Sequence, residues 1–170
     1  MIKIIKITII ICTIALFYSC KDDELFFTRT SYIGNELKID GYYYKQEEGK
    51  TFVKFLFRNG IILTCYTFSS IDLDVVEHRM LSENYYTSLK NDKSRWGVFE
   101  IKNHTIQWSA WSTSVGGGLP SFKCIGTITN DTTFHITKNI NSGGQEFEKN
   151  DIYHFRQFYP KPDSTNIFIK

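Results

Sequence analysis

The sequence predicts an all-β domain that closes into an up-and-down antiparallel barrel of about eight strands, with one short helix after the first hairpin. Short β-rich segments recur at hairpin-like spacing from residue 36 onward, turn signals separate them, and a single stretch has helical character. Closure is the simplest arrangement of such a meander, because it removes the exposed edges that an open sheet would leave. A two-sheet sandwich is the alternative.

Length and composition indicate one folded domain. The chain has 170 residues, of which 42% are hydrophobic and 16% aromatic, and it contains only 3 prolines. Disordered chains are poorer in such residues, and a chain of about 150 residues buries roughly 70% of its unfolded surface. We therefore expect a sizeable core.

Residues 1–19 have the features of a signal peptide. Lys3 and Lys6 precede an apolar run of about ten residues, which is shorter than the ~20 residues of a membrane-spanning helix. The following Phe-Tyr-Ser-Cys, which ends at Cys20, resembles the lipobox of bacterial lipoproteins, whose cysteine is diacylated and becomes the first mature residue. The resemblance implies lipidation of Cys20 and a membrane anchor there. Ordinary secretory cleavage is the alternative.

The residues after this cysteine carry a second resemblance. Lys21, Asp22, Asp23 and Glu24 are similar to the surface-export signal of lipoproteins from Bacteroidetes. This similarity implies a protein anchored in the outer membrane at the cell surface, with the periplasmic face as the alternative. A solvated charged linker is the simpler interpretation, and we expect residues 20–35 to be the lipidated cysteine and a tether.

Net charge argues against a nucleic-acid partner. The chain has 20 Lys and Arg against 18 Asp and Glu, and removal of residues 1–19 takes away two lysines, which leaves 18 against 18. Phosphate backbones are bound by a surplus of basic residues. We expect no nucleic acid as partner, and the sequence does not indicate an oligomeric state.

The clearest local signal is a hairpin at Asn59-Gly60. It joins two apolar runs, 51–58 and 61–68, and Asn-Gly favours a two-residue type I′ turn with positive φ at both positions. Alternation in the first run places Val53, Phe55 and Phe57 on one face and Lys54 and Arg58 on the other.

The remaining elements follow in order. A first strand is predicted over 37–45, and the stretch 69–90 is predicted to be helical over part of its length, with Ser69 or Ser70 as N-cap. Residues 115–120 read as a flexible glycine-rich loop, and residues 160–170 as a C-terminal tail. Further strands are expected over 95–102, 105–111, 121–129, 132–137 and 151–159.

Two segments resemble the lipocalin-like lipoproteins of Bacteroidetes: Leu-Lys-Ile-Asp-Gly-Tyr-Tyr-Tyr at 37–44 and Trp-Gly-Val-Phe-Glu-Ile-Lys-Asn-His-Thr-Ile at 96–106. The resemblance implies a calycin-type barrel over residues 36–159 that binds a ligand. In lipocalins a Gly-x-Trp motif packs against an arginine of a late strand at the closed end. Gly41, Tyr43 and Arg156 would occupy these positions, with tyrosine replacing tryptophan.

No motif indicates catalysis, a metal or a cofactor. The four histidines, at 78, 104, 135 and 154, share no tight spacing with one another or with the cysteines, and the usual nucleophile and metalloprotease patterns are missing. We expect no enzyme activity and no cofactor. Cys65 and Cys124 lie in apolar runs, where either a disulfide or two buried thiols fit.

Aromatic residues are the most informative feature. Many strands carry them on both faces, which fits a filled core, a pocket for an apolar ligand, or a platform for sugar rings. The candidates for ligand binding are Phe55, Phe57, Trp108, Trp111 and Tyr153. Trp108 and Trp111 fall on opposite faces of one strand, so that one is expected in the core and Trp111 exposed or near the glycine-rich loop. The sequence predicts a barrel that binds a small apolar or amphipathic ligand; the alternative is a filled barrel that docks on a glycan or an envelope protein.

Overall fold

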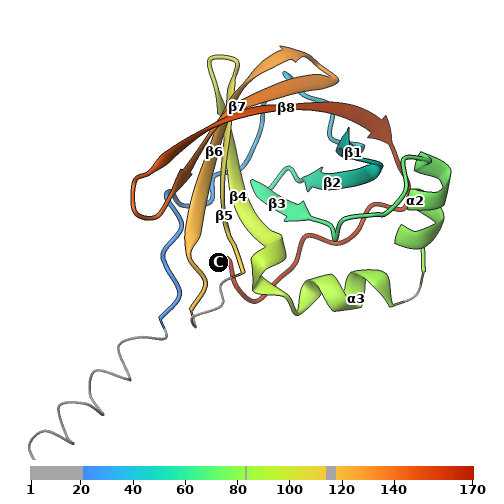
Figure 1. Ribbon diagram of the computed structural model, residues 1–170, viewed down its shortest axis with the longest axis horizontal. Helices are drawn as coiled ribbons and strands as arrows, with labels where there is room; N and C mark the ends of the chain where they lie inside the picture. The colour runs from blue at the N-terminus through green and yellow to red at the C-terminus, as the bar shows by residue number, and fades with distance from the viewer. Residues whose placement is uncertain (1–20, 83, 114–117) are drawn as a thin grey trace, which may run out of the picture.

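The computed structural model describes residues 21–82, 84–113 and 118–170, and these form a closed barrel of eight antiparallel strands in the order of the chain. Figure 1 shows the strands curving around one interior, with the helices to one side. This confirms the predicted fold class. Residues 1–19, Cys20 and residues 114–117 of the glycine-rich loop lie outside the described residues.

The strands follow the predicted segments closely, with the largest difference in the last one, which begins earlier than expected. Their bounds are β1 Gly41–Glu47, β2 Lys50–Leu56, β3 Ile61–Thr64, β4 Trp96–Lys102, β5 Thr105–Trp111, β6 Ser121–Asn130, β7 Thr133–Asn141 and β8 Glu146–Gln157.

The Asn59-Gly60 hairpin is confirmed, but its turn is not type I′. Only Gly60 has positive φ, at 80°; the Phe57 N–H donates to the Ile61 carbonyl, and the Phe57 carbonyl accepts from the Gly60 N–H. A Cβ on Gly60 would lie 2.1 Å from the carbonyl oxygen of Thr30, so the crossing chain also requires glycine there. Two consecutive positive φ angles occur instead in the turn between β1 and β2, at Glu48 and Gly49, and in the turn between β4 and β5, at Asn103 and His104.

Two short helices and a 3-10 turn connect β3 to β4, in the stretch where the sequence predicts one short helix. They are α2 (Leu73–Met80), α3 (Tyr85–Lys90) and η1 (Lys93–Arg95). The N-cap of α2 is Asp72 and not the predicted Ser69 or Ser70; its carboxylate accepts a hydrogen bond from the backbone N–H of Asp74. Each helix buries apolar side chains against the outside of the barrel, so this face of the wall is covered.

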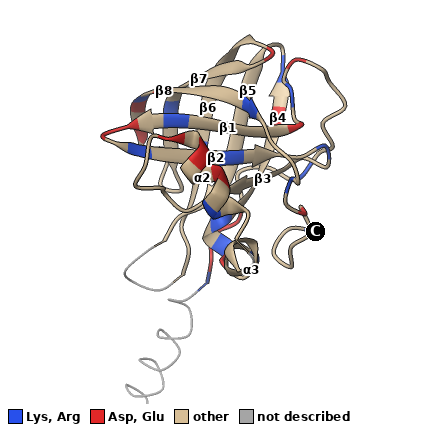
Figure 2. Cartoon of the chain, turned by 90° about the vertical axis from the view of Figure 1, so that its right-hand side faces the viewer, with Lys and Arg blue, Asp and Glu red and all other residues tan. Residues whose placement is uncertain are grey.

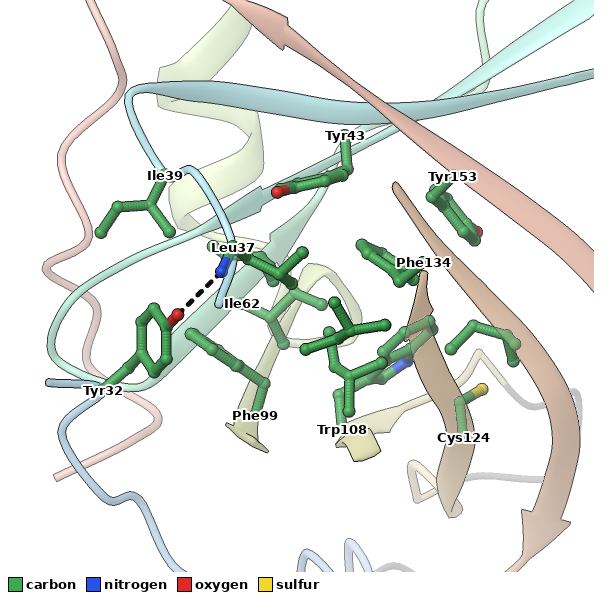
Figure 3. Close-up of a cluster of buried hydrophobic side chains, with 14 residues drawn as sticks. Tyr32, Leu37, Ile39, Tyr43, Ile62, Phe99, Trp108, Cys124, Phe134 and Tyr153 are labelled. Atoms are coloured by element: carbon green, nitrogen blue, oxygen red, sulfur yellow. Dashed lines mark hydrogen bonds between the residues drawn. The ribbon is translucent and has the colours of Figure 1, made fainter. Parts of the chain in front are cut away.

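Side chains therefore pack on both sides of the barrel wall. The interior cluster takes residues from strands around the whole barrel, and its side chains point toward one another (Figure 3); its strand members are Tyr43, Leu56, Ile62, Phe99, Ile106, Trp108, Cys124, Ile128, Phe134, Ile136 and Tyr153. The outer cluster lies between β1 to β4 and the helices, and includes Tyr42, Val53, Phe55, Phe57, Ile61, Leu63, Cys65, Val76, Met80, Leu89 and Trp96.

The two ends of the barrel differ. At the closed end, Tyr32, Leu37 and Ile39 from the chain before β1 complete the interior cluster, and the backbone N–H of Leu37 donates to the Tyr32 hydroxyl (Figure 3). The opposite end, where β1 finishes and β2 begins, is called the mouth below. There the side chains that continue the interior faces of β1 and β2 are Lys45 and Lys54.

Residues 22–37, called the strap, lie against the barrel wall. Near the mouth, Asp23 and Leu119 are joined by a backbone hydrogen bond of 3.0 Å, and Asp22 accepts from the Leu119 N–H and pairs with Lys93 at 2.7 Å. Farther along, the Phe26 N–H donates to the Ser109 hydroxyl. The expected tether is thus bonded to the barrel from residue 22 onward.

In the cartoon of Figure 2, acidic and basic positions are scattered over the strands and helices. Among the described residues, no helix is both long enough and apolar enough to span a bilayer.

Candidate functional site

The candidate site is built around Lys54, a lysine whose side chain lies inside the barrel. Lys54 shares its face of β2 with Leu56 of the interior cluster, and it is only 8% exposed. Its ammonium lies 5.0 Å from the ring centroid of Trp108 and 5.9 Å from that of Tyr153, two other members of this cluster. Burying an ammonium is costly unless it is paired, so its presence here needs a reason.

Few groups satisfy this ammonium. Its Nζ donates one hydrogen bond within the described residues, to the Thr64 hydroxyl on β3 at 3.0 Å. Burial lowers the pKa of Lys54 to about 8, so the side chain remains mainly protonated at pH 7. An ammonium has three N–H donors. The aromatic faces attract its charge by cation–π interaction but offer no lone pair that could accept a hydrogen bond.

A second donor lies in the same part of the barrel. The indole Nε1 of Trp108 is buried and has no hydrogen-bond partner among the described residues. The Trp108 side chain is 3% exposed, and its ring packs edge to face against Tyr153 and Phe134 at centroid distances of 6.1 Å. Buried donors are normally paired, so a second incomplete donor beside Lys54 marks this position.

The other titratable groups nearby do not neutralise Lys54. Burial raises the pKa of the Cys65 thiol to about 12 and that of the Cys124 thiol to about 11, so both are neutral at pH 7. Asp151 lies on β8, two residues before Tyr153, and its carboxylate pairs with Lys45 at 2.7 Å. Lys45 also pairs with Glu47 at 2.8 Å, so the two carboxylates there are engaged with Lys45, and Lys54 forms no ion pair among the described residues.

An open hollow adjoins this group. The pairing of β1 with β8 stops at Tyr44 and His154, whereas β8 continues toward the mouth paired only with β7. Where the two strands diverge lies a hollow of about 380 Å³, lined by Tyr44, Lys45, Gln46, Glu47, Asn150, Asp151, Ile152 and His154. The Lys45–Asp151 ion pair spans the two strands there, and both side chains line the hollow.

The structure does not bring the five predicted ligand-binding residues together. Trp108 and Tyr153 belong to the interior cluster, but Phe55 and Phe57 belong to the outer cluster. The prediction that Phe55 and Phe57 line a pocket together with Trp108 is therefore wrong. Phe55 and Phe57 point outward and are covered by the helices, whereas Lys54 points into the barrel.

Trp111 ends β5 next to the glycine-rich connection, but it is 6% exposed and not a free platform. Its indole N–H donates to the backbone carbonyl of Asp23 in the strap at 2.7 Å, and the ammonium of Lys93 lies 4.1 Å from its ring centroid. A surface hollow of about 390 Å³ between strap and C-terminal segment includes Phe27, Trp111 and Phe168 in its lining. The predicted opposite faces of Trp108 and Trp111 are confirmed.

Gly41, Tyr43 and Arg156 lie where β1 pairs with β8 and the barrel closes, but Arg156 does not pack on Tyr43. Gly41 faces the Arg156 backbone, where a Cβ would lie 2.0 Å from the carbonyl oxygen. The Tyr43 hydroxyl donates to the carbonyl oxygens of Lys38 and Asp131 inside the closed end. Arg156 lies on the outer face, where its guanidinium pairs with Asp74 and Glu77 of α2, each at 2.6 Å.

The cysteines and histidines show no shared site within the described residues. Cys65 and Cys124 are both buried free thiols. No group of three metal-ligating side chains comes together in residues 21–82, 84–113 and 118–170, and the ring of His135 bonds to the Asn150 side chain at 2.8 Å.

Comparison of the chain with known protein families, with curated proteins and with solved structures found no match.

Proposed function

We propose that this chain is a lipoprotein, anchored in the outer membrane through Cys20 and exposed on the cell surface, whose lipocalin-like barrel binds a small amphipathic ligand. The leader sequence supports the anchor and the acidic residues after Cys20 support surface exposure. The closed eight-stranded barrel supports the lipocalin likeness. The proposal assigns no catalytic reaction and no cofactor to the chain.

The observation that carries the binding function is the ammonium of Lys54 inside the barrel. A barrel that serves only as a filled scaffold gains nothing from a buried cation, because an apolar side chain of similar size would be more stable there. A binding site often keeps such an incompletely paired group until its ligand completes it. Lys54 lies beside apolar rings, which are the surroundings an amphipathic molecule needs.

Anchor and surface exposure are tested in the native host. Labelled fatty acid should enter the wild-type chain but not the Cys20→Ser variant, and a protease added to intact cells should remove the wild-type protein. Lack of label in the wild type would contradict the anchor. Labelled protein that resists the protease until the outer membrane is opened would place it on the periplasmic face.

Ligand binding is tested with residues 21–170, which contain every strand of the closed barrel and both apolar clusters. An environment-sensitive apolar dye should bind with one dye per chain, and mass spectrometry of protein purified from the native host should detect a retained small molecule. No saturable dye binding and no retained molecule would refute the binding function.

That negative result would favour the second candidate, a filled barrel that docks on a glycan or on another envelope protein. The observation in its favour is the close packing of the interior rings. Tyr43 and Phe134 have ring centroids 4.9 Å apart, and Phe134 and Tyr153 5.0 Å apart (Figure 3). Rings at these distances fill the centre of the barrel, so a ligand would have to lie toward the mouth, on the side of Lys54.

A further inference from the structure

Within the described residues, the donors around Lys54 are incompletely paired. The ammonium makes one hydrogen bond, to Thr64, and the Trp108 Nε1 makes none within the described residues. No carboxylate in residues 21–82, 84–113 or 118–170 forms an ion pair with Lys54. One positive charge and one N–H donor are therefore left for an external anion with acceptor oxygens.

The number of donors and charges indicates the type of anion. One ammonium balances one negative charge, and the ammonium and the indole N–H can each donate to a separate oxygen. A carboxylate provides one charge and two acceptor oxygens. A dianionic phosphate would place a second charge among the rings of Trp108, Tyr153 and Phe134, and the other cation near Lys54, Lys45, is already paired with Glu47 and Asp151.

We propose that Lys54 and Trp108 hold the carboxylate of a single-chain amphiphile, whose apolar part extends out through the barrel mouth. This inference rests on the proposed binding function and names its ligand class. The ligand enters past the Lys45–Asp151 pair, whose side chains are partly exposed and line the hollow. Its carboxylate then completes the two donors that the chain leaves incomplete.

The test compares decanoate with decanol, which have the same chain length but differ in the head group. Titration calorimetry with residues 21–170 measures both affinities for the wild type, Lys54→Met, Trp108→Phe and Lys50→Met. Lys50 is an exposed lysine at the rim of the mouth, on the same face of β2 as Lys54, so its replacement makes the same change in net charge near the ligand's entry but leaves the donors at Lys54 and Trp108 in place.

We expect the wild type and Lys50→Met to bind decanoate at least about tenfold more tightly than decanol, and Lys54→Met to lose this preference while it still binds decanol. Trp108→Phe should weaken decanoate binding severalfold. In a spectrum of ¹⁵N-labelled wild type, the indole signal that is missing in Trp108→Phe should shift when decanoate is added.

The outcomes separate the two proposals. Equal affinity of the wild type for both probes, or an unchanged preference in Lys54→Met, would overturn the carboxylate inference and leave the binding function in place. No binding of either probe, of the dye or of a molecule from the host would overturn both.

Discussion

Replacing Lys54 by methionine should make the protein more stable, although it removes a hydrogen bond. The pKa of Lys54 is lowered from 10.5 to about 8 by burial, and at about 1.4 kcal/mol for each factor of ten this corresponds to about 3 kcal/mol of destabilisation at pH 7. The lost bond to the Thr64 hydroxyl offsets about 1 kcal/mol. We therefore expect Lys54→Met to raise the free energy of unfolding by about 2 kcal/mol.

The pH dependence follows with a defined sign. Below pH 8 the lysine is protonated in both states, and the full cost of the buried charge is present. Between about pH 8 and 10.5 the unfolded chain binds more protons than the folded one, so wild-type stability rises with pH and then levels off. Lys161, whose pKa is also lowered to about 8, contributes in the same direction and remains in the variant.

Urea unfolding of residues 21–170, followed by circular dichroism at pH 7 and pH 10, measures both effects. The stability difference between Lys54→Met and wild type should be largest at pH 7 and should shrink at pH 10, while Lys50→Met should stay close to wild type at pH 7. A Lys54→Met variant less stable than wild type at pH 7 would refute the reasoning, because the chain would then satisfy the ammonium by itself.

Three further changes test other parts of the structure. Tyr43→Phe removes the hydroxyl that donates to two backbone carbonyls at the closed end and should cost about 1 to 2 kcal/mol in urea unfolding; an unchanged midpoint would mean that these bonds contribute nothing. Gly41→Ala places a Cβ against the β8 backbone and should lower the free energy of unfolding by about 3 kcal/mol or more. The control Gly143→Ala places a Cβ only against a side-chain oxygen at 3.4 Å and should change the free energy of unfolding by less than about 1 kcal/mol. Similar thermal midpoints for the two variants would contradict the tight contact at the barrel closure. Asp22→Ala removes the partner of Lys93 and of the Leu119 N–H, so the start of the strap should loosen and be cut faster by a protease. The circular dichroism signal of the barrel should stay unchanged. Equal cutting rates for variant and wild type would show that the other bonds hold the strap.

The fold could be predicted because its signals are local. Strand alternation, turn residues and one amphipathic helical stretch lie within short windows of sequence, and their order in the chain is also their order in the barrel. The Asn59-Gly60 turn shows the limit of such signals. Its type differs from the one that Asn-Gly favours, and the chain at Thr30, which is distant in sequence, crosses so close that Gly60 has no room for a Cβ.

The site could not be predicted because alternation does not tell which face of a strand points inward. Both faces of β2 are buried, one by the interior cluster and one by α2 and α3, and the face with Phe55 and Phe57 proved to be the outer one. A signal for the correct orientation was present, since an amphipathic helix needs an apolar sheet face to cover. That requirement assigns the apolar face of β2 to the helices and leaves Lys54 to the interior.

The strap also determines how a membrane-anchored barrel would stand on the bilayer. Asp22 and Asp23 are bonded to residues at the start of β6, which is the mouth end in an up-and-down barrel. Two residues of extended chain span at most about 7 Å, so acyl chains on Cys20 would hold the mouth next to the lipid headgroups. A single-chain carboxylate could then pass directly between the outer leaflet and the barrel, with little exposure of its apolar part to water.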